Sequence, residues 1–213
     1  MSLVETPDEM TDRRQDPRYQ RLMEATRAAA RNGYDAVSMR ELAETCRMSM
    51  TTIYQFCRSK DQLIAEAHLS TMQGFRSRVA ARPPRGTTAE QRLLSVVRSF
   101  AKALVVDEQI SRTLMRAVYS LDPSVSETRA SLGTTSSTIF DAAIGDDDIK
   151  DRAAVVSTLG HVIDSVIFNW LSRRHDATWV RTELETAVHT LFRGVGATGE
   201  APEPRRPSRP RRT

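Results

Sequence analysis

Residues 39–63 read MRELAETCRMSMTTIYQFCRSKDQL, and they decide the fold of the N-terminal part of the chain. Two short runs with helical apolar spacing, MRELAETC and MTTIYQF, flank a tight turn, and a third run begins directly after CRSK. Helices of about two turns are not stable alone in water. The stretch therefore predicts a helix, a turn and a helix that are locked against a preceding and a following helix.

Serine residues stand at the predicted start of each of these helices. Ser38 with Glu41 and Ser59 with Gln62 match the capping box, and Ser49 precedes the second short helix. The spacing is that of helix-turn-helix proteins, in which the second helix lies in the major groove of DNA.

The outer side of the second short helix carries residues that are poor core material but suit DNA. Threonine and glutamine can hydrogen-bond base edges, methyl groups can meet a thymine methyl, and a tyrosine hydroxyl can reach a phosphate. A lysine in the first turn of the next helix adds charge beside free backbone amides. The predicted DNA contacts are Arg40, Ser49, Met50, Thr51, Thr52, Tyr54, Gln55 and Lys60. Taken singly, each could be an ordinary surface residue, with Tyr54 a half-buried packing ring; their joint occurrence favours DNA.

The remaining sequence is helical in pattern, without sustained alternation of the kind that strands show. The segment ARPPRGTT, residues 81–88, interrupts the pattern and marks a domain boundary. Helices are predicted at 17–32, 60–79, 88–106, 109–121, 124–144 with a kink or break at Gly133, 149–174 and 177–195. We therefore expect an all-α chain with a disordered arm at 1–16, a three-helix DNA-binding domain at 17–64 with a connecting helix to about 80, a helical domain at 87–196, and a disordered Arg- and Pro-rich tail at 197–213.

Charge is distributed unevenly along the 213 residues, whose formal net charge is +4. Residues 17–86 hold twelve basic and six acidic residues, whereas residues 87–198 hold twelve basic and fourteen acidic ones. A basic N-terminal region suits a polyanion such as DNA, although charge alone does not separate DNA from a membrane surface. The two cysteines, Cys46 and Cys57, are predicted to be buried thiols. With no membrane-spanning run and no signal peptide expected, we predict a cytoplasmic protein.

The segment GYDAVSMRELAETCRMSMTTIYQFCRSKDQLI resembles the N-terminal signature of the TetR family of bacterial transcriptional regulators. The match extends over about residues 18–68, with glycine, aromatic and lysine positions in register. Signature positions are occupied by Gly33, Tyr34, Ala43, Ile53, Tyr54, Phe56, Lys60 and Leu63. Two positions depart from it: Thr51 stands where glycine is usual, and Cys57 where phenylalanine is usual. The resemblance implies a repressor whose C-terminal helical domain binds a small molecule and dimerises.

The two last predicted helices, 149–174 and 177–195, are also the most continuously apolar ones, and their stripes look too wide for burial within one subunit. A symmetric four-helix interface would cover them, so we predict a homodimer that binds a palindromic operator. A larger monomeric core is the alternative explanation for the same stripes.

The effector site is predicted within the second domain from aromatic and polar residues on facing helices. The candidate ligand contacts are Met115, Arg116, Tyr119, Phe140, Ser165, Phe168, Asn169 and Trp170, with Thr135 as a further polar candidate. Apolar residues at helical spacing also describe a plain core. Two segments, MRAVYSLDPSVSE and NWLSRRHDATWVRTELETAVHTLF, are similar to the actinobacterial TetR-type repressors of sterol-catabolism genes, which implies a steroid or its coenzyme A thioester as effector.

An enzyme and an architectural DNA-binding protein are two other functions that a helical chain could have. No GxSxG, HExxH or Gly-rich phosphate loop occurs, so we expect no enzyme and no cofactor. His161 and Asp164 lie three residues apart but lack a third ligand, so we predict no metal site. A ligand-independent architectural DNA-binding protein would not need so large an apolar second domain.

Overall fold

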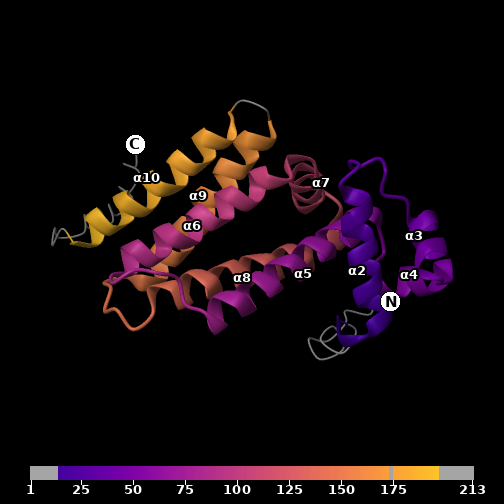
Figure 1. The fold of residues 1–213 in the computed structure, drawn as a ribbon, viewed down its shortest axis with the longest axis horizontal. Helices are drawn as coiled ribbons and strands as arrows, with labels where there is room; N and C mark the ends of the chain where they lie inside the picture. The colour runs from indigo at the N-terminus through magenta and orange to yellow at the C-terminus, as the bar shows by residue number, and fades with distance from the viewer. Residues whose placement is uncertain (1–13, 173–174, 197–213) are drawn as a thin grey trace, which may run out of the picture.

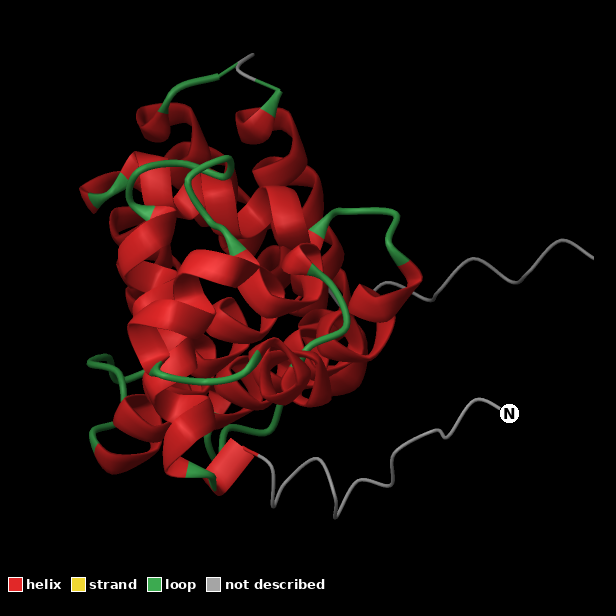
Figure 2. Ribbon diagram, turned by 90° about the vertical axis from the view of Figure 1, so that its right-hand side faces the viewer, coloured by secondary structure: helices red, strands yellow, loops and turns green. Residues whose placement is uncertain are grey.

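The computed structural model describes residues 14–172 and 175–196, and within these ranges it consists of helices and loops (Figure 2). The elements are α2 (Pro17–Ala30), α3 (Met39–Cys46), α4 (Met50–Phe56), α5 (Lys60–Ala81), α6 (Ala89–Val106), α7 (Glu108–Val118), the 3-10 turn η1 (Pro123–Val125), α8 (Ser126–Ile144), α9 (Arg152–Leu171) and α10 (Ala177–Gly196). The predicted all-α class is confirmed. Of the arm and tail predicted to be disordered, residues 1–13 and 197–213 lie outside the described residues, while Arg14 and Gln15 are helical.

The helices form two parts that α5 connects (Figure 1). Helices α2, α3 and α4 gather at one end, which we call the head, and α6 to α10 form the elongated body. Helix α5 begins in the head and continues along the body beside α8. One helix therefore belongs to the cores of both parts.

Side chains cap the helices of the head as the sequence predicts. The Ser49 hydroxyl accepts a hydrogen bond from the Thr52 amide at 3.0 Å, and Ser59 accepts one from the Gln62 amide at 3.1 Å. The side chain of Gln62 accepts from the Arg58 amide at 2.6 Å. These bonds satisfy amides that a helix start leaves free, and the Ser49 bond stabilises α4, which is too short to form alone.

The turn between α3 and α4 is built by a Schellman-type helix end. The amide of Met48 donates to the Ala43 carbonyl at 2.8 Å, and Arg47 adopts a left-handed conformation with φ 54°. Such an end usually carries glycine, because a side chain at positive φ is strained. The strained Arg47 backbone sets the direction in which α4 leaves the turn.

The apolar core continues from the head into the body. Tyr19 and Phe56 meet edge to face in the head with ring centroids 5.7 Å apart, and both rings are buried. The same cluster of buried residues includes Leu63 of α5 and Leu93 and Leu159 of the body. Both cysteines are buried thiols, as predicted. The two parts therefore share one continuous apolar core.

Three body helices differ from the sequence prediction in their course or bounds. Helix α7 ends at Val118 rather than at 121. Helix α8 runs through Gly133 without interruption, so the predicted break is absent; buried neighbours Leu132 and Thr135 hold the helix in place. Helix α9 begins at Arg152 rather than at 149, because Asp151 adopts a left-handed conformation with φ 56°.

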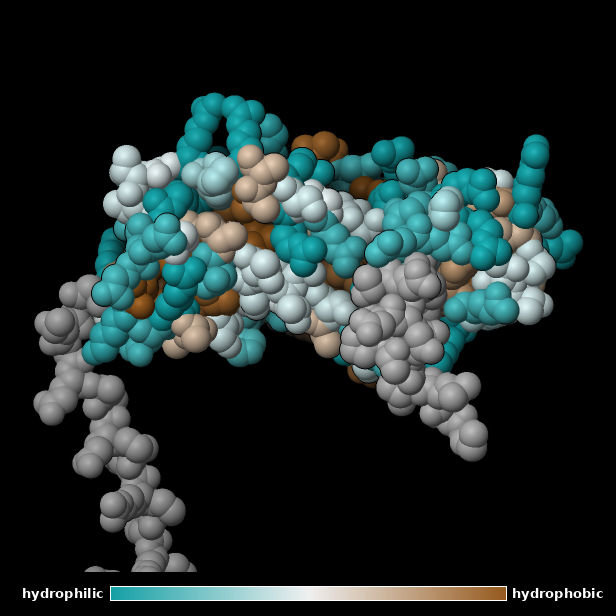
Figure 3. All heavy atoms as spheres, turned by 90° about the horizontal axis from the view of Figure 1, so that it is seen from below, coloured by the Kyte–Doolittle hydropathy of each residue, from teal (hydrophilic) through white to brown (hydrophobic). Residues whose placement is uncertain are grey.

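Helix α9 is long and apolar enough to cross a membrane by length and composition. It packs against α8, α7 and α10 in the body, and 33 % of its most apolar 18-residue window is buried. We therefore interpret it as a partly buried helix of the folded body. On the face shown in Figure 3, hydrophobic surface is most visible on the body at the end away from the head.

Candidate DNA-reading surface and effector cavity

The outer surface of α4 carries the side chains predicted to contact DNA. Ile53 and Phe56 face the core, whereas Thr51, Tyr54 and Gln55 are exposed, with 52 % of Tyr54 accessible. Met50 and Thr52 are half-buried, and Arg40 and Ser49 are exposed. The apolar residues of α4 recur at helical spacing and pack on the core. The opposite side of the helix therefore carries a polar stripe. The surface formed by Arg40, Ser49 and the exposed or half-buried residues of α4 is called the reading surface below.

Three of the predicted contacts, Arg40, Ser49 and Thr52, already have partners within the head. The hydroxyls of Ser49 and Thr52 lie 2.9 Å apart and share a hydrogen bond, and Arg40 forms an ion pair with Glu44, one turn further along α3, at 3.3 Å. Such exposed pairs are weak and exchange readily with other partners. A phosphate or base can therefore compete for these groups without a large cost.

Lys60 lies at the joint between head and body rather than alone at a helix start. Its ammonium is 4.2 Å from the ring centroid of Tyr34, and the Arg116 guanidinium of α7 is 3.9 Å from the same centroid. The Tyr34 hydroxyl donates to Asp61, which also accepts from Ser120 at 2.5 Å. Burial and the Asp61 carboxylate raise the pKa of Tyr34 to about 12, so its hydroxyl stays protonated as a donor. We call the contacts among Tyr34, Lys60, Asp61, Arg116 and Ser120 the Tyr34 joint. It connects the first turn of α5 to α7 and to the residues that follow α7.

A second joint is centred on Glu66, which is 2 % exposed. The carboxylate accepts hydrogen bonds from the Tyr19 hydroxyl, from the Thr128 hydroxyl at 2.7 Å, and from the Arg14 guanidinium at 3.2 and 3.3 Å. We call Arg14, Tyr19, Glu66 and Thr128 the Glu66 cluster. It joins the residues before and in α2 to α5 and to α8 of the body.

The ionised form of Glu66 is favoured inside the cluster. Burial acts to raise the pKa of this carboxyl, but the Arg14 charge and the hydrogen bonds from Arg14, Tyr19 and Thr128 outweigh it and hold the pKa below its ordinary value. Burial beside that carboxylate raises the pKa of Tyr19 as well. The cluster is therefore a fully paired buried charge, and breaking it leaves polar groups without partners.

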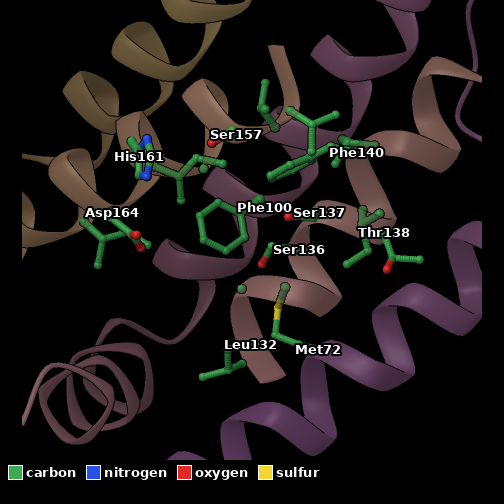
Figure 4. Close-up of a pocket in the computed structure, with 18 of the residues that line it drawn as sticks. Met72, Phe100, Leu132, Ser136, Ser137, Thr138, Phe140, Ser157, His161 and Asp164 are labelled. Atoms are coloured by element: carbon green, nitrogen blue, oxygen red, sulfur yellow. The ribbon is translucent and has the colours of Figure 1, made fainter. Parts of the chain in front are cut away.

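The body contains a cavity of about 670 Å³ between α5, α6, α7, α8 and α9. Its inner wall is apolar, with side chains such as Met72, Phe100, Leu132 and Phe140 (Figure 4). Ligand sites of this kind have volumes of about 300–1,000 Å³ and mostly apolar walls with a few polar groups. The cavity can take an apolar molecule of moderate size.

One side of the cavity wall is polar and exposed. Ser137 and Thr138 of α8 and Ser157, His161 and Asp164 of α9 belong to it (Figure 4). The glycines on the same two helices, Gly133 and Gly160, also line the cavity, and a Cβ atom at either would meet no atom within 4 Å. We call this region between α8 and α9 the mouth of the cavity. Its composition suits the polar part of a ligand whose apolar part lies inside.

Only some of the predicted ligand contacts lie on this wall. Met115, Tyr119 and Phe140 line the cavity, and the Tyr119 hydroxyl donates to Asp164 at 2.8 Å. Arg116 lies against the Tyr34 ring instead, and Ser165 and Phe168 are exposed. Asn169 is half-buried and donates to the Ser165 carbonyl. Trp170 is buried, and the Arg112 guanidinium lies 4.4 Å from its ring centroid. Thr135 is buried and donates to the Ser131 carbonyl at 2.8 Å.

Several residues of the two sites are not among those predicted from the sequence. A glutamate within the apolar segment LIAEAHL, residues 63–69, is the sequence signal for the buried charge of Glu66. His68 in the same segment lines the cavity. Among residues 14–172 and 175–196 no group of three or more His, Cys, Asp or Glu side chains could hold a metal, and His161 and Asp164 stand at the cavity mouth instead.

Both parts of the chain match family models. Residues 22–67 match the model described as "Bacterial regulatory proteins, tetR family", and residues 86–191 match "Tetracyclin repressor-like, C-terminal domain". The chain belongs to the TetR family. It is a TetR-type transcriptional repressor and not an enzyme, and the family prediction made from GYDAVSMRELAETCRMSM and the following residues is confirmed.

Curated relatives of this TetR-family protein include the HTH-type transcriptional repressor KstR of Rhodococcus jostii, 28% identical over 187 residues that cover 87% of each chain. KstR of Mycobacterium tuberculosis is 28% identical over 190 residues, covering 86% of this chain and 84% of that protein.

Solved structures share the fold. A TetR transcriptional regulator from Rhodococcus sp. RHA1 superposes with a TM-score of 0.73 at 17% identity, covering 84% of this chain and 96% of that one. FadR from Bacillus subtilis in complex with stearoyl-CoA gives 0.57 at 16% identity, covering 83% and 99%. At these identities the likeness shows the fold alone.

Proposed function

We propose that this TetR-family repressor binds a palindromic operator as a homodimer in the cytoplasm and releases it when a small hydrophobic effector occupies the body cavity. The observation that carries this proposal is the position of α5. This helix supplies Met72 and Phe75 to the cavity wall, and its first two turns hold the Tyr34 joint and Glu66. A ligand that shifts α5 would therefore change the position of the head.

The effector class proposed is a steroid or an acyl-CoA thioester. An apolar interior with a polar mouth suits a molecule with a large apolar part and one polar end. Similarity to KstR supports the same classes, as does the narrower resemblance to sterol-catabolism repressors in the segments around residues 115–127 and 169–192. FadR, a fold relative, is known with stearoyl-CoA bound.

For an effector to release the repressor from its operator, it must bind more tightly to the conformation that does not bind DNA than to the one that does. DNA affinity should therefore be measured for the promoter region next to the gene, over a salt series, with and without 5α-androstan-3-one or stearoyl-CoA. Release by either compound supports the proposal. DNA binding that neither compound changes would contradict the effector half, and binding with little sequence preference would point to an architectural protein.

The reading surface should lose affinity when its exposed aromatic residue is removed. Tyr54→Ala is expected to weaken operator binding about tenfold or more, because a lost contact to base or phosphate costs ~1–3 kcal/mol. Tyr54 is 52 % exposed, so folding should be unaffected. Arg76→Ala, which removes an exposed charge on α5 outside the head, is the control and should retain operator affinity within about twofold. Equal affinities of both variants, measured by fluorescence anisotropy, would exclude α4 from the interface.

The proposed dimer interface lies on α9 and α10. Phe168 of α9 is 60 % exposed, and half-buried Trp179, Leu191 and Phe192 lie on the neighbouring α10. Exposed large apolar side chains on adjacent helices are typical of a surface that a partner covers. A symmetric four-helix contact between two copies would bury them and fix the distance between the two heads.

A charge in this surface should separate the subunits. Phe168→Glu is expected to give a monomer at micromolar concentration, because a buried unpaired carboxylate costs several kcal/mol. Leu121→Glu is the matched control, since Leu121 is 97 % exposed in the loop between α7 and η1 and belongs to neither α9 nor α10. Analytical ultracentrifugation of both variants and the wild type measures the result. Phe168→Glu sedimenting as a dimer at wild-type concentrations would place the interface elsewhere.

A further inference from the structure

His68 of α5 is a polar side chain in the cavity wall that the fold leaves without a partner. Its Nδ1 is buried and has no hydrogen-bond partner, and the ring contacts the cavity shared with Met115, Leu132 and Ile167. No hydrogen bond or ion pair of His68 occurs with any residue in 14–172 or 175–196. Buried polar groups in proteins are nearly always paired, so an imidazole that lines a cavity and has an unpaired nitrogen points to a missing ligand.

The ring is neutral at physiological pH. Burial lowers the pKa of His68 to about 4, because the surrounding protein disfavours the charged form. A neutral imidazole offers one N–H donor and one acceptor nitrogen. It can therefore pair with a ketone through the donor, or with a hydroxyl through either nitrogen.

The other titratable groups of the cavity wall are already engaged or stand at the mouth. The Arg129 guanidinium donates to the Val118 and Ser120 carbonyls at 2.9 and 2.6 Å. Asp141 pairs with Arg152, and Asp164 accepts from Tyr119. The remaining member, His161, is exposed at the mouth. Among the described residues, Arg129 is the only arginine or lysine on the cavity wall, and it is exposed. The buried part of the cavity therefore has no cation to compensate an anionic group, which selects a neutral group at its inner end.

We infer that His68 recognises one uncharged oxygen, a ketone or hydroxyl, on an otherwise apolar effector whose polar outer end lies at the mouth between α8 and α9. The inference rests on the proposed function and adds the chemical group that the cavity selects. His68 lies two residues after Glu66 on the same helix, so a bond formed at His68 acts directly on the helix that holds the head.

The test compares two steroids that differ by one oxygen. 5α-Androstan-3-one and 5α-androstane, both delivered from methyl-β-cyclodextrin, are titrated against wild-type protein and His68→Phe while protein fluorescence is followed. Phenylalanine keeps the aromatic volume but has no hydrogen-bonding atoms. The wild type should bind the ketone about tenfold more tightly than the hydrocarbon, the value of one buried hydrogen bond. His68→Phe should bind both equally.

The outcomes separate this inference from the proposed function. Equal binding of both steroids by the wild type, or a ketone preference that survives in His68→Phe, would overturn the role of His68 and leave effector binding intact. Failure of the wild type to bind either steroid would count against the proposed steroid effector and against the inference together. Operator affinity without steroid, and a melting temperature no lower than that of the wild type, check that His68→Phe is folded; an unfolded variant is replaced by His68→Leu, for which the same loss of preference is expected.

Discussion

Glu66→Ala is expected to lower the free energy of unfolding by about 3–5 kcal/mol, the usual cost of removing one partner from a buried charge network. The substitution leaves the Tyr19 hydroxyl, the Thr128 hydroxyl and the Arg14 guanidinium without their shared acceptor. Tyr19 and Thr128 are each 1 % exposed, so water cannot replace the carboxylate. Urea unfolding at one fixed protein concentration measures the loss, because dimerisation makes stability depend on concentration.

Two further variants define what the carboxylate contributes. Glu66→Gln keeps an acceptor oxygen and should cost less, about 1–3 kcal/mol, because mainly the charge-assisted bonds are lost. Glu24→Ala removes an exposed glutamate of α2 and should change stability by less than about 0.5 kcal/mol. If Glu66→Ala were no less stable than Glu24→Ala, the Glu66 cluster would not hold the head to the body.

The contribution of Glu66 should also depend on pH in a defined direction. Its pKa in the folded protein lies below the ordinary value of 4.5, so folding favours the ionised form. The stability it adds is therefore fully present above its unfolded pKa and is lost as the pH falls through the lower folded pKa. The difference in unfolding free energy between wild type and Glu66→Gln should stay constant at neutral pH and shrink below about pH 4.5.

The head could be predicted from sequence because its signals are local. Caps at Ser49 and Ser59, the turn before Met50 and the apolar spacing of Ile53 and Phe56 each act within a few residues. The side of α4 that faces outward follows from that spacing alone. Helix boundaries deviated by a few residues in the body: α7 ends at Val118 rather than at 121, and α9 begins after the left-handed Asp151.

The two joints could not be predicted, because they depend on packing between distant parts of the chain. Thr128 meets Glu66 across 62 positions of sequence, and Ser120 meets Asp61 across 59. A charge pattern shows that Glu66 stands among apolar residues, but it does not show which residues approach it. Tyr34 was assigned as a signature residue, and its contacts with Lys60 and Arg116 became visible only in the fold.

The face of α9 that lines the cavity also could not be predicted from its apolar pattern. Val156, Gly160, Ile163 and Ile167, spaced by three or four residues, face the cavity, whereas Phe168 faces outward. Helix α9 is apolar on most of its circumference, so its sequence does not tell which stripe lines a cavity and which meets a partner. The predicted ligand contacts on α9 were therefore placed on faces that do not line the cavity.

Gly133→Phe should produce a repressor that binds its operator but resists release, with about 100-fold more effector needed. Gly133 of α8 lines the cavity, and a Cβ atom there would meet nothing within 4 Å. An aromatic side chain at this position will turn toward the apolar interior rather than water and occupy the effector's space. A ligand that enters the cavity must then displace this side chain. Such overpacking costs ~3 kcal/mol, which corresponds to about 100-fold in effector affinity.

Gly133→Ala separates this effect from a change in the helix itself. Alanine in a helix interior is about 1 kcal/mol more favourable than glycine, yet it adds only one methyl group to the wall. Both variants should bind operator with wild-type affinity, because Gly133 belongs to α8, a helix of the body that lies outside the head (Figure 1). The measurement is the concentration of 5α-androstan-3-one or stearoyl-CoA that releases half of the bound DNA. Only Gly133→Phe should need a higher effector concentration, because release is proposed to follow when the effector occupies the space beside α5. Equal effector concentrations for the two variants would place the effector outside this cavity.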